Sequence, residues 1–320
     1  RQPTTDNRQH KMNQTTNSIL MIRPVAFRMN EQTAVNNYYQ KVLENTTPST
    51  VNAKAQNEFD AFVEKLRKVG VNVIVVEDTL DPDTPDSIFP NNWISAHEDG
   101  TIVLYPMEAE NRRIERREDV ITFLKNKKYN SSLIDLTEAE TQAKYLEGTG
   151  SIIFDAVNRD AYACISSRTD VELFEQLCTK LNYNPVSFIS EDAIGNAIYH
   201  TNVMLSIGEH VIVICSESIP DLIERAMVLN RLKASNRNLI DVTFRQMNQF
   251  CCNCIEVDDI NGNSHLIMSL TAYNAFSKEQ IAEISKTTSV LPVDIHTIET
   301  IGGGSARCMI FGVLPLQSEN

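Results

Sequence analysis

A cysteine, a histidine and a glutamate in this sequence have the types and local contexts that nucleophilic catalysis at a carbon–nitrogen bond requires. Cys308 follows a glycine run at 302–304, His200 stands just before an apolar stretch, and Glu147 precedes a GTG turn. A thiol with a pKa of about 8.5 needs a nearby positive charge to ionise at neutral pH. A protonated His200 would supply that charge and then protonate a leaving nitrogen, while Glu147 orients the imidazole. The trio predicts attack on a planar, amide-like carbon.

Each of these residues also has an ordinary structural explanation when it is taken alone. A histidine before a strand is usually held in the core, a cysteine in an apolar strand is usually packing, and an acid before a glycine-rich turn usually serves the turn. The catalytic interpretation therefore depends on whether the fold brings these residues together.

The positions of the polar residues follow an internal repeat. A pattern of strand, tight polar turn, strand, helix and strand begins at Asn92, Gly150, Asn202, Asn253 and Gly304, so the spacings are 58, 52, 51 and 51 residues. Asp-Gly and Asn-Gly pairs between apolar strands are strong hairpin signals. In a ring of equal units the starts of the first strands would meet at one rim. That rim would collect Asp86, Asn92, Glu147, His200, Asn202 and Cys308.

Helices and chain ends complete the predicted fold. Apolar residues recur at spacings of three and four in segments such as 51–69, which stops at Gly70, as expected for one buried helical face. The fifth strand, 306–314, has no partner downstream, and 18–25 has no hairpin mate, so these two strands should pair. We predict a single α/β catalytic domain over 18–320, a five-bladed propeller with pseudo-fivefold symmetry, after a flexible polar leader at 1–17. The alternative is an open α/β sheet of unrelated hairpins.

Composition limits the partners. The chain has 320 residues, with 29 Lys and Arg against 42 Asp and Glu, a net charge of −13 and a pI near 5.0. This balance argues against nucleic acid or an anionic membrane as a partner. Seven scattered cysteines favour a reducing cytoplasm over a disulfide framework. The run at 251–254 lacks a second Cys/His cluster, so it predicts strand packing and no metal.

Five motifs together resemble those of a known superfamily. They are DSIFPNNW (86–93), LEGTGSIIF (146–154), SSRT (166–169), YHTNVML (199–205) and GGGSARCM (302–309). This set resembles the arginine deiminase, dimethylarginine dimethylaminohydrolase and amidinotransferase superfamily, the penteins, over roughly 18–314. It is most similar to a bacterial branch of citrulline utilisation hydrolases.

The resemblance implies a five-bladed α/β propeller and a catalytic mechanism without a cofactor. In that superfamily the counterpart of Cys308 forms a covalent intermediate, that of His200 is the acid and base, and that of Glu147 is its acidic partner. The substrate would be held by Arg168 at its carboxylate, by Arg112 on a mobile loop, and by Asp86, Phe89 and Asn92 in the D-x-x-F loop.

Two departures from the superfamily pattern bear on the substrate. Relatives that act on guanidines carry carboxylates where this chain has Asn91-Asn92 and Asn202. A buried guanidinium without a carboxylate partner would cost several kcal/mol. Asparagine offers both a donor and an acceptor, which suits a neutral ureido group. The prediction is hydrolysis of a ureido amino acid, most simply citrulline to ornithine, carbon dioxide and ammonia.

Other functions stay open at this point. The asparagines could be drift in an amidinotransferase, an arginine deiminase or a dimethylarginine hydrolase, with the guanidine held by Asp86. A propeller without catalysis, used only for binding, is the other class, but it has no need for a nucleophile and an imidazole on one rim. The sequence is compatible with a homodimer and does not determine the oligomeric state.

Overall fold

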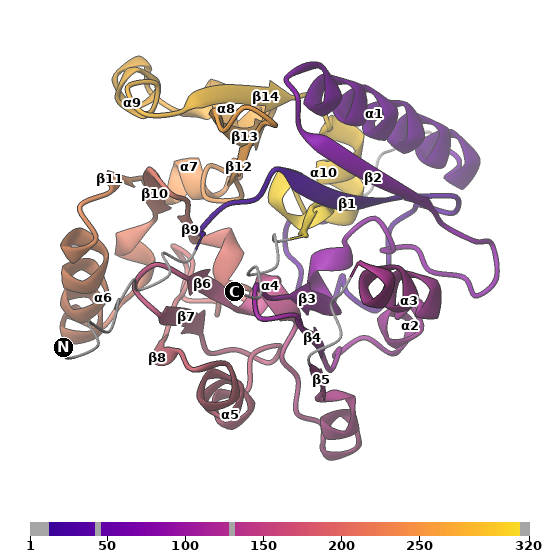
Figure 1. The fold of residues 1–320 in the computed structure, drawn as a ribbon, viewed down its shortest axis with the longest axis horizontal. Helices are drawn as coiled ribbons and strands as arrows, with labels where there is room; N and C mark the ends of the chain where they lie inside the picture. The colour runs from indigo at the N-terminus through magenta and orange to yellow at the C-terminus, as the bar shows by residue number, and fades with distance from the viewer. Residues whose placement is uncertain (1–12, 42–45, 128–131, 314–320) are drawn as a thin grey trace, which may run out of the picture.

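Five three-stranded sheets carry the strands of this protein (Figure 1). The computed structural model describes residues 13–41, 46–127 and 132–313. The strands are β1 (Ser18–Arg23), β2 (Asn72–Glu77), β3 (Ile94–Ala96), β4 (Thr101–Leu104), β5 (Ser132–Asp135), β6 (Ile153–Asp155), β7 (Asp160–Cys164), β8 (Asn184–Phe188), β9 (Leu205–Ile207), β10 (Val211–Ile214), β11 (Asn238–Asp241), β12 (Ile255–Asp258), β13 (Ser264–Ser269), β14 (Ser289–Val293) and β15 (Phe311–Gly312).

All five sheets have the same internal arrangement. The first strand pairs antiparallel with the second and the second pairs parallel with the third, in β3-β4-β5, β6-β7-β8, β9-β10-β11 and β12-β13-β14. The fifth sheet, β15-β1-β2, repeats this arrangement with strands from the two ends of the chain. Ile19 pairs with Gly312 and Leu20 with Phe311. The predicted pairing of the first and last strands is therefore confirmed, and so are the five equal units.

The α-helices of the described residues are α1 (Pro48–Lys68), α2 (Glu110–Arg113), α3 (Glu118–Asn126), α4 (Gly148–Ser151), α5 (Val171–Leu181), α6 (Leu222–Ala234), α7 (Phe244–Met247), α8 (Leu270–Ala275), α9 (Lys278–Ile284) and α10 (His296–Gly302). In Figure 1, α1, α5, α6 and α9 lie at the outside of the molecule, whereas α4 and α10 lie nearer its centre. The helix predicted at 51–69 corresponds to α1, which begins earlier because Thr47 caps it by accepting from the Thr50 amide and Pro48 occupies its first position.

The core is divided among several hydrophobic clusters, each between sheet and helix. In one of them, Phe174 and Leu177 of α5 pack with Ala161 and Ala163 of β7. The clusters also reach neighbouring sheets: Leu20 of β1, for example, shares a cluster with Ile94 of β3 and Leu124 of α3. The apolar stripes of the helices thus pack where adjacent sheets meet.

The starts of the units differ from the prediction. Short helical turns replace the expected strand residues there: η1 (Pro90–Asn92), α4, η3 (Thr201–Val203) and η5 (Ala306–Met309). Local backbone preferences account for two of them, because Pro90 has a restricted φ and Gly148 has a φ of +49° that a strand cannot accommodate. The apolar run 306–314 predicted a strand at Cys308, but Cys308 lies in the 3-10 turn η5.

The predicted polar leader is only partly within the described residues. Positions 1–12 lie outside them, whereas residues 14–16 pack against the sheets. The Gln14 side-chain amide donates to the carbonyls of Phe154 and Ile207, and Thr16 donates to the carbonyl of Val313. This end of the leader is an ordered part of the fold. No helix within the described residues is long and apolar enough to cross a bilayer.

Candidate active site

A small cavity beside Cys308 brings the predicted residues together. Its volume is about 20 Å³, enough for about one water molecule. The side chains and glycines around it come from four of the five units and from the segment after β1. They are Thr33, Asn37, Asp86, Phe89, Asn92, Arg112, Arg168, Tyr199, His200, Gly302, Gly303, Gly304 and Cys308.

His200 and Glu147 form the central buried pair. Nε2 of His200 lies 2.7 Å from Oε2 of Glu147. His200 is 5% exposed and Glu147 is 0% exposed. Glycine is required beside them: a Cβ on Gly150 would lie 2.4 Å from Nδ2 of Asn92 and 3.0 Å from the imidazole. Because Nε2 is taken by the carboxylate, Nδ1 is the ring nitrogen left for proton transfer.

The charges of this pair differ from the sequence-based prediction. Burial raises the pKa of Glu147, but the Arg168 guanidinium and the hydrogen bond from His200 outweigh it and lower that pKa to about 2. Burial lowers the pKa of His200, and the contacts with Glu147 only partly oppose this. His200 is therefore neutral at pH 7 and donates its Nε2 proton to an ionised carboxylate. Burial therefore disfavours the resting imidazolium that the sequence predicted.

Cys308 is 7% exposed and lies in η5, where the glycine run brings the backbone close to an aromatic ring. A Cβ on Gly302 or Gly304 would approach the Phe89 ring to 2.8 and 2.9 Å, respectively. Phe89 thus packs flat on the glycines and shapes the wall next to the sulfur.

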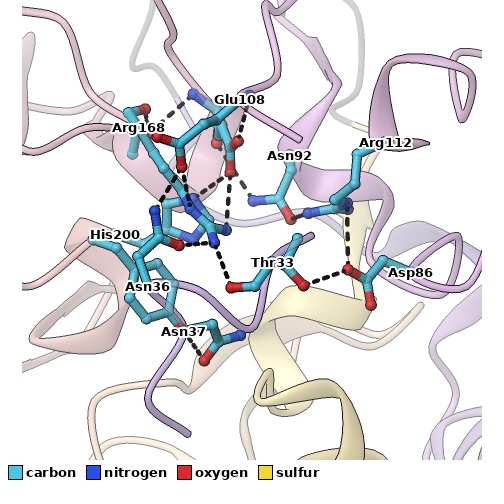
Figure 2. A network of polar contacts seen from close by, with 12 residues as sticks. Thr33, Asn36, Asn37, Asp86, Asn92, Glu108, Arg112, Arg168 and His200 are labelled. Atoms are coloured by element: carbon cyan, nitrogen blue, oxygen red, sulfur yellow. Dashed lines mark hydrogen bonds and ion pairs between the residues drawn. The ribbon is translucent and has the colours of Figure 1, made fainter. Parts of the chain in front are cut away.

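Arg112 joins two of the predicted substrate-binding residues. It is buried, at 3% exposed, and donates from Nη1 to Oδ1 of Asn92 at 2.9 Å (Figure 2). Its Nε lies 3.9 Å from Asp86, and it forms an ion pair with Glu115 at 2.9 Å. A position on a mobile loop was expected for Arg112. In this structure Arg112 lies in α2, and the carboxylate of Glu115 pairs with its buried side chain.

Arg168 lies between two carboxylates and the segment after β1. Its guanidinium lies 3.5 Å from Glu147 and 3.2 Å from Glu108, and it donates to the carbonyl of Thr33 and to the side chain of Asn36 (Figure 2). It also stacks over the ring of Tyr199 at 4.9 Å. Arg168 therefore lines the cavity, as predicted, and its grip on a substrate carboxylate stays a prediction.

Sequence reasoning missed the residues that cover this cavity. Thr33 donates to Asp86, and Asn37 accepts from the hydroxyl of Tyr199, so residues 30–41 cross the site. Residues 30–41 are polar and lie between predicted elements, so their sequence gave no specific indication that they cover the site. Asn253 was also missed. Its Nδ2 lies 3.2 Å from Sγ of Cys308, and Nδ2 of Asn202 lies 3.5 Å from the same sulfur. Its place at the start of the fourth unit could have indicated it.

The arrangement supports thiol chemistry on a small polar substrate. A cysteine and a neutral imidazole line one cavity, an ionised carboxylate fixes the imidazole, and amides surround the sulfur. A nucleophile, a proton carrier and an orienting group are the three parts that covalent catalysis needs. Across the parts of the chain that the structure describes, no group of three or more histidine, cysteine or acidic side chains is placed to hold a metal ion.

Comparison with solved structures gives the same fold. The chain is similar to unliganded ArgZ, described as an arginine dihydrolase from the ornithine-ammonia cycle in cyanobacteria, with a TM-score of 0.70 and 16% identity over 94% of this chain and 41% of ArgZ. AgrE with ornithine and NAD⁺ also has a TM-score of 0.70 and 16% identity, over 94% of this chain and 40% of AgrE. This chain thus spans about two fifths of those proteins.

A single-domain relative is similar along its whole length. A dimethylarginine dimethylaminohydrolase variant, solved as an adduct with S-methyl-L-thiocitrulline, has a TM-score of 0.63 and 16% identity over 93% of this chain and 100% of its own. No protein with a curated description matches the sequence.

A family model covers almost the whole chain. The model for eukaryotic N,N dimethylarginine dimethylhydrolase matches residues 23–315, which include Cys308, His200 and Glu147. The chain shares its fold with ArgZ, AgrE and the dimethylaminohydrolase. The chain belongs to the N,N dimethylarginine dimethylhydrolase family, within the pentein superfamily.

Proposed function

We propose that this protein hydrolyses the ureido group of an amino acid, with citrulline as the simplest substrate. The supporting observation is the charge of the cavity wall. Arg112 and Arg168 also line the cavity, but each is already paired with a carboxylate outside its lining, Arg112 with Glu115 and Arg168 with Glu147 and Glu108. Among the described residues Asp86 is the one carboxylate in the lining. A guanidinium substrate would depend on Asp86 for its counter-charge, whereas a neutral ureido group needs none, and a buried cation without a partner is costly.

Two buried acceptors beside the sulfur have no donor. Oδ1 of Asp86, which lines the cavity, and Oδ1 of Asn202, whose Nδ2 contacts the Cys308 sulfur, make no hydrogen bond within the described residues although both are buried. Buried acceptors are rarely left unpaired unless a ligand or water completes them. The N–H groups of a ureido nitrogen would supply donors for both, and this matches the prediction made from the asparagines.

The proposed reaction gives one role to each of the three predicted catalytic residues. The Cys308 sulfur attacks the ureido carbon and a carbon–sulfur bond forms, while His200 takes the thiol proton. His200 then returns this proton to the side-chain nitrogen as the carbon–nitrogen bond breaks, and ornithine leaves. Water, deprotonated by His200, cleaves the S-carbamoyl intermediate to carbamate, which breaks down to carbon dioxide and ammonia. Glu147 keeps the imidazole oriented throughout.

The amino-acid end of the substrate would bind at Arg168. The planar fork of arginine suits a carboxylate. In this structure Glu108, Asn36 and the Thr33 carbonyl occupy that fork, and the cavity is only about 20 Å³. A substrate carboxylate must therefore displace these acceptors, so binding is coupled to movement of residues 30–41.

A guanidine substrate is the second candidate. The unpaired Oδ1 of Asp86 could accept from a guanidinium as well as from a ureido group, and ArgZ, which shares the fold, is described as an arginine dihydrolase. Burial raises the pKa of Asp86, with Arg112 opposing it, so the charge that would hold a guanidinium is weakened.

We also propose that the five sheets close into a five-bladed propeller. The β15–β1 pairing and the repeated strand order support closure, because blades repeated around an axis leave only short, protected sheet edges. Small-angle scattering of the purified chain would test this shape, and an elongated profile would contradict it.

A substrate panel tests the function. Ornithine and ammonia release would be measured from L-citrulline, L-arginine and methylated arginines, with Cys308→Ser as the control. We expect citrulline to be consumed fastest, and a trapped adduct of Cys308 by mass spectrometry. Faster deimination of arginine than consumption of citrulline would overturn the proposal in favour of the guanidine candidate.

A further inference from the structure

The Cys308 sulfur is held by two side-chain amides. Nδ2 of Asn253 lies 3.2 Å from Sγ, and Nδ2 of Asn202 lies 3.5 Å from it. All three side chains are at most 7% exposed, so these contacts are shielded from bulk water. We propose that Asn253 is a positioning residue that, with Asn202, stabilises the ionised form of Cys308 by N–H donation. The inference rests on the proposed role of Cys308 as nucleophile.

The amide of Asn253 has no freedom to turn its donor away. Its Oδ1 accepts from the backbone N–H of Arg307 at 3.2 Å, and its Nδ2 donates to the carbonyl of Asn202 at 3.3 Å. The second Nδ2 proton is the one directed at the sulfur. Because both ends of the amide are tied to backbone, the donor is already in place before substrate enters, as preorganised stabilisation of charge requires.

The amides favour the ionised sulfur over the thiol. A thiolate accepts from both Nδ2 groups, whereas a thiol gains one weak donor contact of its own, to Oδ1 of Asn253 at 3.5 Å. Hydrogen bonds to a charged group are roughly twice as strong as neutral ones. The balance therefore lowers the free energy of the thiolate relative to the thiol.

The imidazole does not take this role in the resting protein. No hydrogen bond or ion pair joins His200 to Cys308 within the described residues, and Nε2 of His200 is taken by Glu147. Burial also lowers the pKa of His200, so it carries no charge at neutral pH.

The other six cysteines make the inference measurable. Each is buried, and burial raises its thiol pKa: to about 12 for Cys164, Cys178, Cys215 and Cys254, and also well upward for Cys251 and Cys252. An alkylating reagent used below pH 10 on the folded protein should therefore report on Cys308 alone.

The experiment measures the rate of iodoacetamide alkylation of Cys308 from pH 5 to pH 10, with the modified peptide identified by mass spectrometry. The variants are Asn253→Ala, which removes the donor, and Asn253→Asp, which keeps the shape and places a carboxylate against the sulfur. Asn126→Asp adds the same charge at an exposed position of α3 and is the matched control. Thermal unfolding midpoints are recorded for all four proteins.

We expect the midpoint of the alkylation profile to rise in the order wild type, Asn253→Ala, Asn253→Asp, with the last slower than wild type at pH 7 by about tenfold or more. Asn126→Asp should match wild type. Turnover should show a lower kcat with little change in KM, because Asn253 does not line the cavity.

Unchanged midpoints in both Asn253 variants would overturn the inference. So would a fall in rate by the same factor at every pH, together with a lower unfolding temperature, since that pattern reports a structural role only. Alkylation needs no substrate, so a shifted midpoint in a protein that leaves citrulline unchanged would refute the proposed function and keep this inference.

Discussion

The guanidinium of Arg112 fixes the orientation of the Asn92 amide. Nη1 of Arg112 donates to Oδ1 at 2.9 Å, so the Nδ2 end of that amide faces the backbone carbonyl of Glu147 at 3.4 Å. Asn92 is thereby linked at one end to a buried cation and at the other to the backbone of the catalytic carboxylate. This connection makes the identity of the residue at position 92 a test of substrate charge.

Replacing Asn92 by Asp should shift the preference of the enzyme from ureido toward guanidino substrates. One carboxylate oxygen would keep the contact with Arg112, and the other would add a negative charge to a wall that has one lining carboxylate. We expect the ratio of kcat/KM for citrulline to that for arginine to fall by about tenfold or more. Steady-state assays with both substrates measure this ratio, and Asn126→Asp is the charge control. A ratio that did not change would show that position 92 does not sense substrate charge.

Replacing Glu147 by Gln should impair both catalysis and stability. The ionised carboxylate holds the imidazole at 2.7 Å and faces Arg168 at 3.5 Å, so its loss leaves a buried guanidinium with less compensation. We expect kcat to fall by about 10²–10⁴-fold and stability to fall by about 3–5 kcal/mol. Because the hydrogen bond and charge of Glu147 both raise the pKa of His200, that pKa should fall further, as NMR titration would show. A rise would contradict the assigned charges.

Acid should destabilise the protein through the same pair. The pKa of Glu147 is lowered to about 2 in the fold from a usual value of about 4.5, so its contribution is complete above pH 4.5 and is lost as the pH falls toward 2. Its size is about 3 kcal/mol, at 1.36 kcal/mol for each pKa unit. His200, with its folded pKa lowered, adds a loss that begins near pH 6.5. Urea unfolding at pH 7, 5 and 3 measures the contributions of Glu147 and His200 to the free energy of unfolding. In Glu147→Gln this free energy should depend less on pH below pH 4.5.

Adding a methyl group at Gly150 should displace the imidazole. The Cβ would lie 2.4 Å from Nδ2 of Asn92 and 3.0 Å from Nδ1 of His200, closer than packing allows. We expect Gly150→Ala to lose about 10²-fold in kcat, since misplacement of about 1 Å can cost that much. Gly312→Ala is the control, because its Cβ would meet Thr16 at an ordinary 3.5 Å. Equal activity of the two variants would show that Gly150 is dispensable.

Much of the fold follows from local patterns in the sequence. Repeated hairpins at spacings of 51 and 52 residues, helices with one apolar face such as 51–69, and two unpaired terminal strands were enough to predict five equal units. Those predictions agree with the five sheets and with the β15–β1 pairing. The start of each unit was less predictable, because turns such as PNN at 90–92 and TNV at 201–203 are too short to show a helical period.

The sequence by itself determined which reactive groups are present and in what order: Glu147, His200 and Cys308, each at the start of a repeated unit. Only the tertiary structure decided their charges and partners. Burial leaves His200 neutral, Glu115 fixes Arg112, and Asn253 reaches the sulfur from another unit. The physical reason is that desolvation and hydrogen bonds between distant residues depend on distances of a few ångströms, which residue types and spacing do not encode.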